Sequence, residues 1–162
     1  MAIPVKVINY LKKNKIKYEI IEHRKVFTAL DSAQTQKIKP LQVVKTLVMK
    51  LDKDYCLALL PASKNLDKAK FKKAVGNAQA RSVHKIDFAK EPWMKKNLPG
   101  KVGATPAFGR MLELPVYMDG VLFKLKELIL NTGDYTQSFK IKIKDFIKLE
   151  EPIKANFSKP KK

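Results

Sequence analysis

Residues 43–51 read Val-Val-Lys-Thr-Leu-Val-Met-Lys-Leu, a run of β-branched and apolar residues that is typical of a strand. The polar tripeptide at 52–54, Asp-Lys-Asp, predicts a turn after it. Residues 55–60 follow and are nearly all apolar, with Cys56 among them. We therefore expect a hairpin at the centre of a sheet, with Cys56 buried in its second strand.

Lys45 is the unusual residue of this stretch. Side chains alternate between the two faces of a strand, so Lys45 shares a face with the apolar Val43, Leu47, Met49 and Leu51. An unpaired ammonium in such a setting is destabilising or loses its proton. Two interpretations stay open. Lys45 lies near the strand end and extends its amine to water, or the amine is held by an acidic side chain or an anionic ligand.

The length and composition predict one globular domain. The chain has 162 residues, of which 45% are hydrophobic and 30% charged. We expect the domain to span 1–150, followed by a basic, flexible C-terminal tail of low structural content at 151–162. No apolar run is long enough to span a membrane, and the N-terminus does not resemble a signal peptide. With a single cysteine, the composition favours the cytoplasm.

Charge is the strongest compositional signal. Thirty-four basic and fifteen acidic residues give a formal charge of +19, which attracts polyanions such as nucleic acid. Nearly all the basic residues are lysines, which suit contact with phosphates better than reading of bases. The densest cluster lies in a helix predicted over about 67–75, with Asp67 at its start and Gly76 as its cap: Lys68, Lys70, Lys72 and Lys73. The alternative is a compositional bias towards lysine with no partner.

The remaining pattern predicts a mixed α/β (α+β) fold. We expect helices over 4–14, from Thr28 or Asp31 towards Lys37, over 87–97 and over 145–149. We expect further strands at 17–22, 80–83, 115–119, 122–125, 127–131 and 138–143. His23, His84 and Cys56 have no metal-ligand spacing, and no catalytic triad is apparent, so we expect neither a metal nor another cofactor.

A glycine-rich segment at 100–109, Gly-Lys-Val-Gly-Ala-Thr-Pro-Ala-Phe-Gly, predicts a defined loop. Glycines allow a backbone to approach a ligand, and consecutive amides can point at an anion. The segment matches no phosphate-binding loop pattern, and an ordinary turn between strands is the alternative.

The order of these motifs resembles the YbaK/prolyl-tRNA editing-domain family. The resemblance rests on a strand ending at His23, the strand around Lys45, Gly-Ala-Thr-Pro-Ala-Phe-Gly at 103–109, Pro-Val-Tyr-Met-Asp at 115–119 and Ile-Leu-Asn-Thr-Gly at 129–133. It runs from about Pro4 to Leu149. It implies a partly barrel-like mixed sheet with flanking helices, and hydrolysis of the ester that joins a wrong amino acid to tRNA.

The resemblance also assigns residues. Lys45 corresponds to the family's functional lysine, and Gly103, Ala104, Thr105 and Pro106 to its substrate-binding loop. His23 falls where some members have a pocket tyrosine, and Asn131, Thr132 and Gly133 where a polar segment borders the pocket. Val102 precedes Gly103 where some relatives have a second glycine, and the spacing from Pro106 to Gly109 is one residue longer than in some members.

An aminoacyl ester is reactive enough to need positioning and oxyanion stabilisation rather than a strong nucleophile. We expect Lys45 to bind the terminal phosphate or the ester carbonyl, the amides of Gly103 and Ala104 to hold the carbonyl or the adenosine, and the four lysines at 68–73 to contact tRNA phosphates. The expected function is a free-standing deacylase acting on tRNA-Pro that carries Ala or Cys, with tRNA and prolyl-tRNA synthetase as partners. Two alternatives stay open: a tRNA-binding module without activity, and a small-anion-binding or structural protein. The residues do not identify the amino acid, the tRNA or the oligomeric state.

Overall fold

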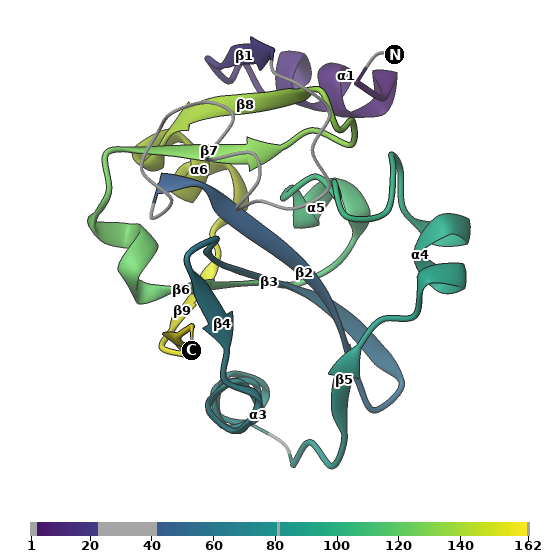
Figure 1. The fold of residues 1–162 in the computed structure, drawn as a ribbon, viewed down its shortest axis with the longest axis vertical. Helices are drawn as coiled ribbons and strands as arrows, with labels where there is room; N and C mark the ends of the chain where they lie inside the picture. Colours follow the sequence, from purple (N-terminus) through teal and green to yellow (C-terminus); the bar gives the residue numbers. More distant parts are fainter. Residues whose placement is uncertain (1–2, 23–41, 81, 162) are drawn as a thin grey trace.

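The computed structural model describes residues 3–22, 42–80 and 82–161 (Figure 1). In this part of the chain the strands form sheets of five, three and two strands with helices around them, a mixed α+β fold. The helices are α1 (Val5–Lys13), α3 (Lys68–Gln79), α4 (Glu91–Asn97), α5 (Gly109–Leu112), α6 (Ile143–Glu150) and the 3-10 helix η2 (Gly120–Lys124). The strands are β1 (Glu19–Glu22), β2 (Val44–Leu51), β3 (Asp54–Pro61), β4 (Lys64–Leu66), β5 (Ile86–Phe88), β6 (Val116–Asp119), β7 (Glu127–Asn131), β8 (Gln137–Lys142), β9 (Ile153–Ala155) and β10 (Ser158–Pro160).

The hairpin of β2 and β3 is the centre of the larger sheet, as predicted. The two strands are antiparallel, from Val44 opposite Pro61 to Leu51 opposite Asp54. At the turn Asp52 adopts a φ of 57°, a left-handed conformation that aspartate tolerates. The sheet order is β5-β2-β3-β6-β9, with β6 parallel to β3 and β9 parallel to β6.

The second sheet, in the order β1-β8-β7, meets the first at one point. A parallel bridge pairs Val43, which immediately precedes β2, with Ile129 of β7. No other bridge between β2 and β7 occurs in the described segments, so the two sheets diverge beyond this pair. They form a curved, partly barrel-like surface that does not close.

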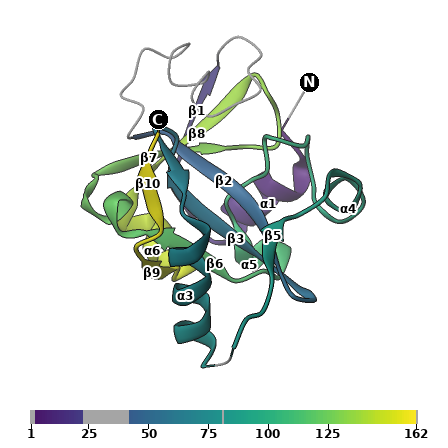
Figure 2. The same cartoon turned by 60° about the horizontal axis from the view of Figure 1, so that its bottom comes forward.

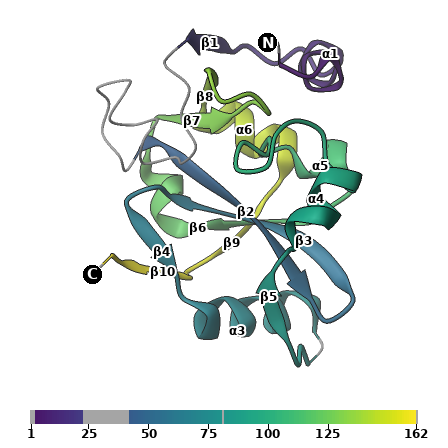
Figure 3. The same ribbon diagram turned by 45° about the vertical axis from the view of Figure 1, so that its right-hand side comes forward.

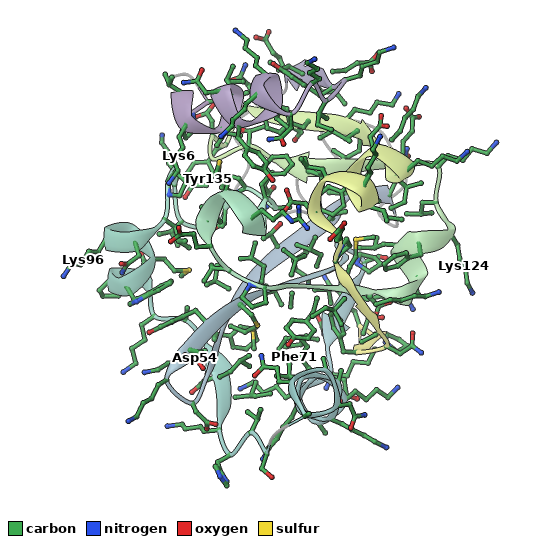
Figure 4. All side chains as sticks on the ribbon, turned by 180° about the vertical axis from the view of Figure 1, so that it is seen from behind. Lys6, Asp54, Phe71, Lys96, Lys124 and Tyr135 are labelled. Atoms are coloured by element: carbon green, nitrogen blue, oxygen red, sulfur yellow. The ribbon has the colours of Figure 1, made fainter. Side chains whose placement is uncertain are left out.

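The two faces of β2 and β3 bury different cores. Val44 and Val48 face a core that includes α1, α5 and α6, whereas Met49 and Leu51 face the core under α3. Phe71 of α3 lies in this second core, between the helix and the sheet (Figure 4). Cys56 is fully buried there, as expected. None of the described helices combines the length and the apolar content needed to cross a bilayer.

Several predicted elements differ from the structure. Asp67 does cap α3 by accepting from the amide of Lys70, but the helix continues through Gly76 to Gln79 and is capped by Ala80, which has a φ of 51°. The expected strand at 80–83 is absent from the described residues there, and β5 forms further along, because its residues pair with β2. Residues 120–124 form η2 rather than a strand. The helix predicted from Thr28 or Asp31 lies outside the described residues.

The C-terminal segment also differs from the expected flexible tail. It forms β9 and β10, and β10 lies beside β4 (Figure 2). The two strands pair with Pro160 opposite Lys64. Phe157, between the two strands, is fully buried. The carboxylate of Asp119, itself buried, accepts hydrogen bonds from the amides of Phe157 and Ser158 at 3.0 and 2.9 Å. These contacts were not predictable from the lysine-rich composition of the segment.

Candidate functional site

Lys45 lies on β2 and is half-buried. Its Nζ donates a hydrogen bond to the backbone carbonyl of Lys64, at 2.7 Å. Burial, and to a smaller extent the positive charge of Lys161, lowers the pKa of Lys45 below its ordinary value. Within the described part of the chain no carboxylate pairs with this amine. An ammonium has three N–H donors, so the amine retains the capacity to bind an anion or a carbonyl.

The bridge between β2 and β7 places Asn131 on the same face as Lys45. Both residues lie two positions beyond the bridged pair Val43–Ile129, on strands that run in parallel. Since side chains alternate along a strand, both project from the same face as that pair. The register thus places Lys45 and Asn131 on the same face, two positions past the bridge, where the two strands begin to separate.

The glycine-rich loop is held against the segment that follows β7. The amide of Lys101 donates to the carbonyl of Gly133 at 2.9 Å, and the hydroxyl of Tyr135 donates to the carbonyl of Val102. A Cβ added to Gly100 would lie 2.5 Å from the Cα of Gly133, so the two backbones are in direct contact. Both glycines have positive φ, which favours glycine at these positions.

The loop and the 131–133 segment differ in which polar groups stay accessible. The amide of Ala104 donates to the carbonyl of Lys101 within a turn, whereas no described residue accepts from the amide of the exposed Gly103. Thr105 and Pro106 are buried. Thr132 is fully buried, and its hydroxyl donates to the carbonyl of Gln137 at 3.0 Å, so it supports the turn between β7 and β8.

The structure thus brings most of the expected pocket residues into one continuous tract. It runs from Lys45 across Asn131 to Gly133, and from there through the Lys101–Gly133 hydrogen bond to residues 103–106. We call this set the pocket tract. His23, the remaining expected pocket residue, lies outside the described residues.

The four lysines of α3 do not form one patch. Lys68 pairs with Asp87 at 3.5 Å, and Lys72 donates to the carbonyl of His84, so these two face β5. Lys70 and Lys73 instead line a shallow groove between α3 and residues 153–156. The helix lies at the opposite end of the molecule from β7 and β8 (Figure 3).

Two contributions to the pocket tract escaped the sequence interpretation. Tyr135 braces the loop through the carbonyl of Val102, a contact between residues 33 positions apart. Lys161 approaches Lys45 because the register of β10 on β4 brings the C-terminus to Lys64. No local sequence motif predicts either contact, since both join segments that are distant in sequence.

Among the described residues, no group of three or more His, Cys, Asp and Glu side chains is arranged to hold a metal ion. The chemistry that the described part of the tract offers is that of an ammonium, backbone amides and an Asn side chain. Such a set can bind an anionic or carbonyl oxygen and orient it.

Comparison with known proteins identifies the family. A family model described as the aminoacyl-tRNA editing domain matches residues 23–149, which include every residue of the pocket tract. A search of the curated proteins finds no match.

Solved structures share the fold over nearly the whole chain. One, described as a candidate trans-editing enzyme for prolyl-tRNA synthetase, is 23% identical, with a TM-score of 0.80 and 96% of both chains covered. A hypothetical protein is 15% identical, with a TM-score of 0.80 over 95% of this chain and 99% of its own. A protein from Marinobacter aquaeolei VT8 described in connection with signal transduction is 16% identical; the match, with a TM-score of 0.71, covers 97% of this chain and 31% of the other.

Proposed function

The chain belongs to the family of aminoacyl-tRNA editing domains, and on that premise we propose that it is a deacylase that hydrolyses the ester of a mischarged tRNA in trans. The proposed substrate is a tRNA-Pro that carries alanine or cysteine. The fold shared with the candidate trans-editing enzyme over 96% of both chains supports this choice.

One observation carries the proposal: the half-buried ammonium of Lys45 lies on the same face as the polar end of β7, and the glycine-rich loop is hydrogen-bonded to the segment that follows this strand. β7 ends at Asn131, and the hydrogen bond runs from the amide of Lys101 to the carbonyl of Gly133. An ammonium that is partly desolvated and holds only a backbone carbonyl is suited to an incoming anionic group. The 3′ end of a tRNA supplies such a group next to the ester.

In the proposed mechanism Lys45 binds the terminal phosphate or the ester carbonyl. The amide of Gly103 donates to the oxyanion that forms when water attacks the ester, and Ala104 supports the turn that presents this amide. The ester needs no strong nucleophile, so the positioning of a water molecule or a ribose hydroxyl supplies the remaining rate enhancement.

The other pocket residues bind the amino acid and the adenosine. We assign this role to Thr105 and Pro106 on the loop, to Asn131, Thr132 and Gly133 after β7, and to His23. Thr132 acts through the turn it stabilises, because its hydroxyl is engaged with Gln137. The buried Thr105 and Pro106 restrict the volume left for the amino acid.

We further propose a single domain in the cytoplasm, with tRNA as its substrate and prolyl-tRNA synthetase as a partner that produces the mischarged species. The lysines of α3 contribute phosphate contacts from two sides of the helix. Lys70 and Lys73 form one side, together with Lys154 of β9. Lys68 and Lys72 form the other, next to β5.

The direct test is release of amino acid from a panel of tRNA-Pro species charged with Ala, Cys, Ser or Pro. We expect turnover of Ala- or Cys-tRNA-Pro, sparing of Pro-tRNA-Pro, and loss of turnover in Lys45→Ala. Lys53→Ala, at an exposed turn, is the matched control and should retain full activity. Absence of turnover on every charged tRNA would overturn the proposal.

A tRNA-binding module without hydrolysis is the second candidate. It is favoured by one observation, that the amide of Ala104 and the hydroxyl of Thr132 are already engaged inside the protein. Tight, salt-sensitive tRNA binding without turnover of any charged species would select it.

A further inference from the structure

A basic groove lies on the other side of the molecule from α3. It has a volume of about 710 Å³ and runs between the end of α1 and the first turns of α6. Five exposed lysines from three parts of the chain line it: Lys15, Lys17, Lys142, Lys144 and Lys148. We call this set the basic groove.

The charge of the basic groove is largely uncompensated. Of the described residues that line it, Asp145 alone carries a carboxylate. Arg110 lines it as well, but its guanidinium pairs with Glu151 at 2.6 Å. None of the five lysines forms an ion pair with a carboxylate in the described segments, whereas the neighbouring Lys140 is flanked by Glu19 and Glu127. Five ammonium groups around one concave surface, none of them ion-paired among the described residues, attract a polyanion rather than a single small anion.

Helix α1 and strand β7 each run from the basic groove to the pocket tract, so their lengths give the distance between the two sites. Pro4, at the start of α1, contacts Gly133, and Asn14, at the end of α1, lines the groove. Ten residues of helix correspond to about 15 Å. Along β7, Glu127 lies opposite Lys142 at the groove and Asn131 lies at the tract, a separation of about 13 Å. One RNA arm is long enough to reach both.

We propose that the basic groove binds the phosphate backbone of the RNA whose 3′ end enters the pocket tract. This inference rests on the proposed function and names a surface, separate from the α3 lysines, that would supply most of the affinity for the substrate. The groove presents five cations close to β7 that form no ion pair among the described residues, whereas two of the four α3 lysines already hold protein groups at the far end of the molecule. The ligand is a ribose-phosphate chain, recognised through charge and not through its bases.

The test compares two variants with the same change in charge. The groove variant is Lys17→Gln/Lys144→Gln/Lys148→Gln. The control variant is Lys53→Gln/Lys96→Gln/Lys124→Gln, three exposed lysines outside the groove, of which Lys96 and Lys124 extend into solvent (Figure 4). Affinity for uncharged tRNA is measured against salt concentration, so that the readout does not depend on hydrolysis.

We expect the groove variant to bind tRNA at least about tenfold more weakly than wild type, with the slope of log Kd against log salt reduced by about 2 to 3. The control variant should change Kd by less than about threefold, through its net charge alone. With an active wild type, the groove variant should lose kcat/KM through KM while kcat stays unchanged.

The inference is overturned if both variants lose the same affinity, if the groove variant binds as wild type does, or if wild type binds no tRNA. It is also overturned if the groove lysines are required for binding to anionic vesicles and not for binding to tRNA. Groove-dependent tRNA binding without turnover would uphold the inference and refute the proposed function. Turnover that does not depend on the groove lysines would refute the inference and support the proposed function.

Discussion

Gly100 and Gly133 pack backbone against backbone. A Cβ at Gly100 would lie 2.5 Å from the Cα of Gly133, and the φ angles of the two residues are 82° and 100°. The contact joins two segments that are 33 positions apart in sequence, and together with the Lys101–Gly133 hydrogen bond it fixes the loop at 103–106 relative to Asn131. The position of this loop therefore depends on the absence of two side chains.

Gly100→Ala is expected to lower the free energy of unfolding by about 2–4 kcal/mol, because it adds both a backbone strain and a clash with backbone atoms. Displacement of the loop should also lower kcat/KM by ~100-fold. Urea unfolding and deacylation assays measure the two effects. Gly76→Ala, inside α3, is the contrast and should be neutral or stabilising by up to ~1 kcal/mol. Wild-type stability and activity in Gly100→Ala would contradict the role assigned to this contact.

Lys45→Met is expected to abolish deacylation without destabilising the protein. The lowered pKa of Lys45 means that the folded state binds this proton less tightly than the unfolded state does. Its burial therefore opposes folding at neutral pH, and this cost is relieved as pH rises through the lowered pKa towards 10.5. The variant should have an unchanged or higher Tm at pH 7 and no turnover. A large fall in Tm would show that Lys45 is chiefly structural.

The same lowered pKa predicts an alkaline limit to activity. As pH rises, Lys45 should lose its charge before the exposed lysines lose theirs, and the KM for charged tRNA should rise at that pH. In Lys45→Arg the side chain stays charged, so any residual activity should lack this limit. A pH profile of kcat/KM, corrected for spontaneous ester hydrolysis, measures it. An identical alkaline limb in both proteins would assign it to another group.

Asp119→Asn should detach the C-terminal segment. The carboxylate accepts from the amides of Val121, Phe157 and Ser158, and an Asn side chain has only one acceptor oxygen for these three donors. Loss of buried hydrogen bonds should lower the free energy of unfolding by about 1–3 kcal/mol. Hydrogen exchange at Phe157 and Ser158 should accelerate. Asp87→Asn, at an exposed carboxylate whose ion pair with Lys68 lies at the surface, is the control and should have little effect.

Glu150→Gln should change the pH dependence of stability. Glu150 is buried, and burial raises the pKa of its carboxyl above the ordinary 4.5. The folded state therefore binds this proton more tightly, so the stability that protonated Glu150 contributes is present below pH 4.5 and is lost as pH rises through the raised pKa.

Gln can keep both contacts of Glu150, since its oxygen can accept from the amide of Arg110 and its NH₂ can donate to the hydroxyl of Tyr10. The stability of wild type minus that of the variant should fall with increasing pH across this window and then become constant. Thermal unfolding from pH 4 to pH 8 measures the difference. A difference that is flat with pH would contradict the raised pKa.

Local pattern was sufficient for much of the fold. The hairpin of β2 and β3, helix α1 and strands β7 and β8 were all expected from their residues, because apolar periodicity and turn residues act within a few positions. The motif order around Lys45 and Gly103 led to the family, which the match over 127 positions, 23–149, confirms. The C-terminal strands were missed because β10 is stabilised by β4 and by the carboxylate of Asp119, and composition does not reveal such partners.

The residues themselves determined that a lysine would lie on an apolar strand face and that a glycine-rich loop would follow. Only the tertiary structure decided where that amine goes, to the carbonyl of Lys64 and near the C-terminal Lys161. It also decided that Asn131 shares its face, two positions past the bridge between Val43 and Ile129. It also gathered the lysines of α1, β8 and α6 around one groove, while the α3 lysines, which are adjacent in sequence, were separated. The reason is geometric: a helix distributes neighbouring residues around its axis, whereas strand pairing and helix packing bring distant residues to one surface.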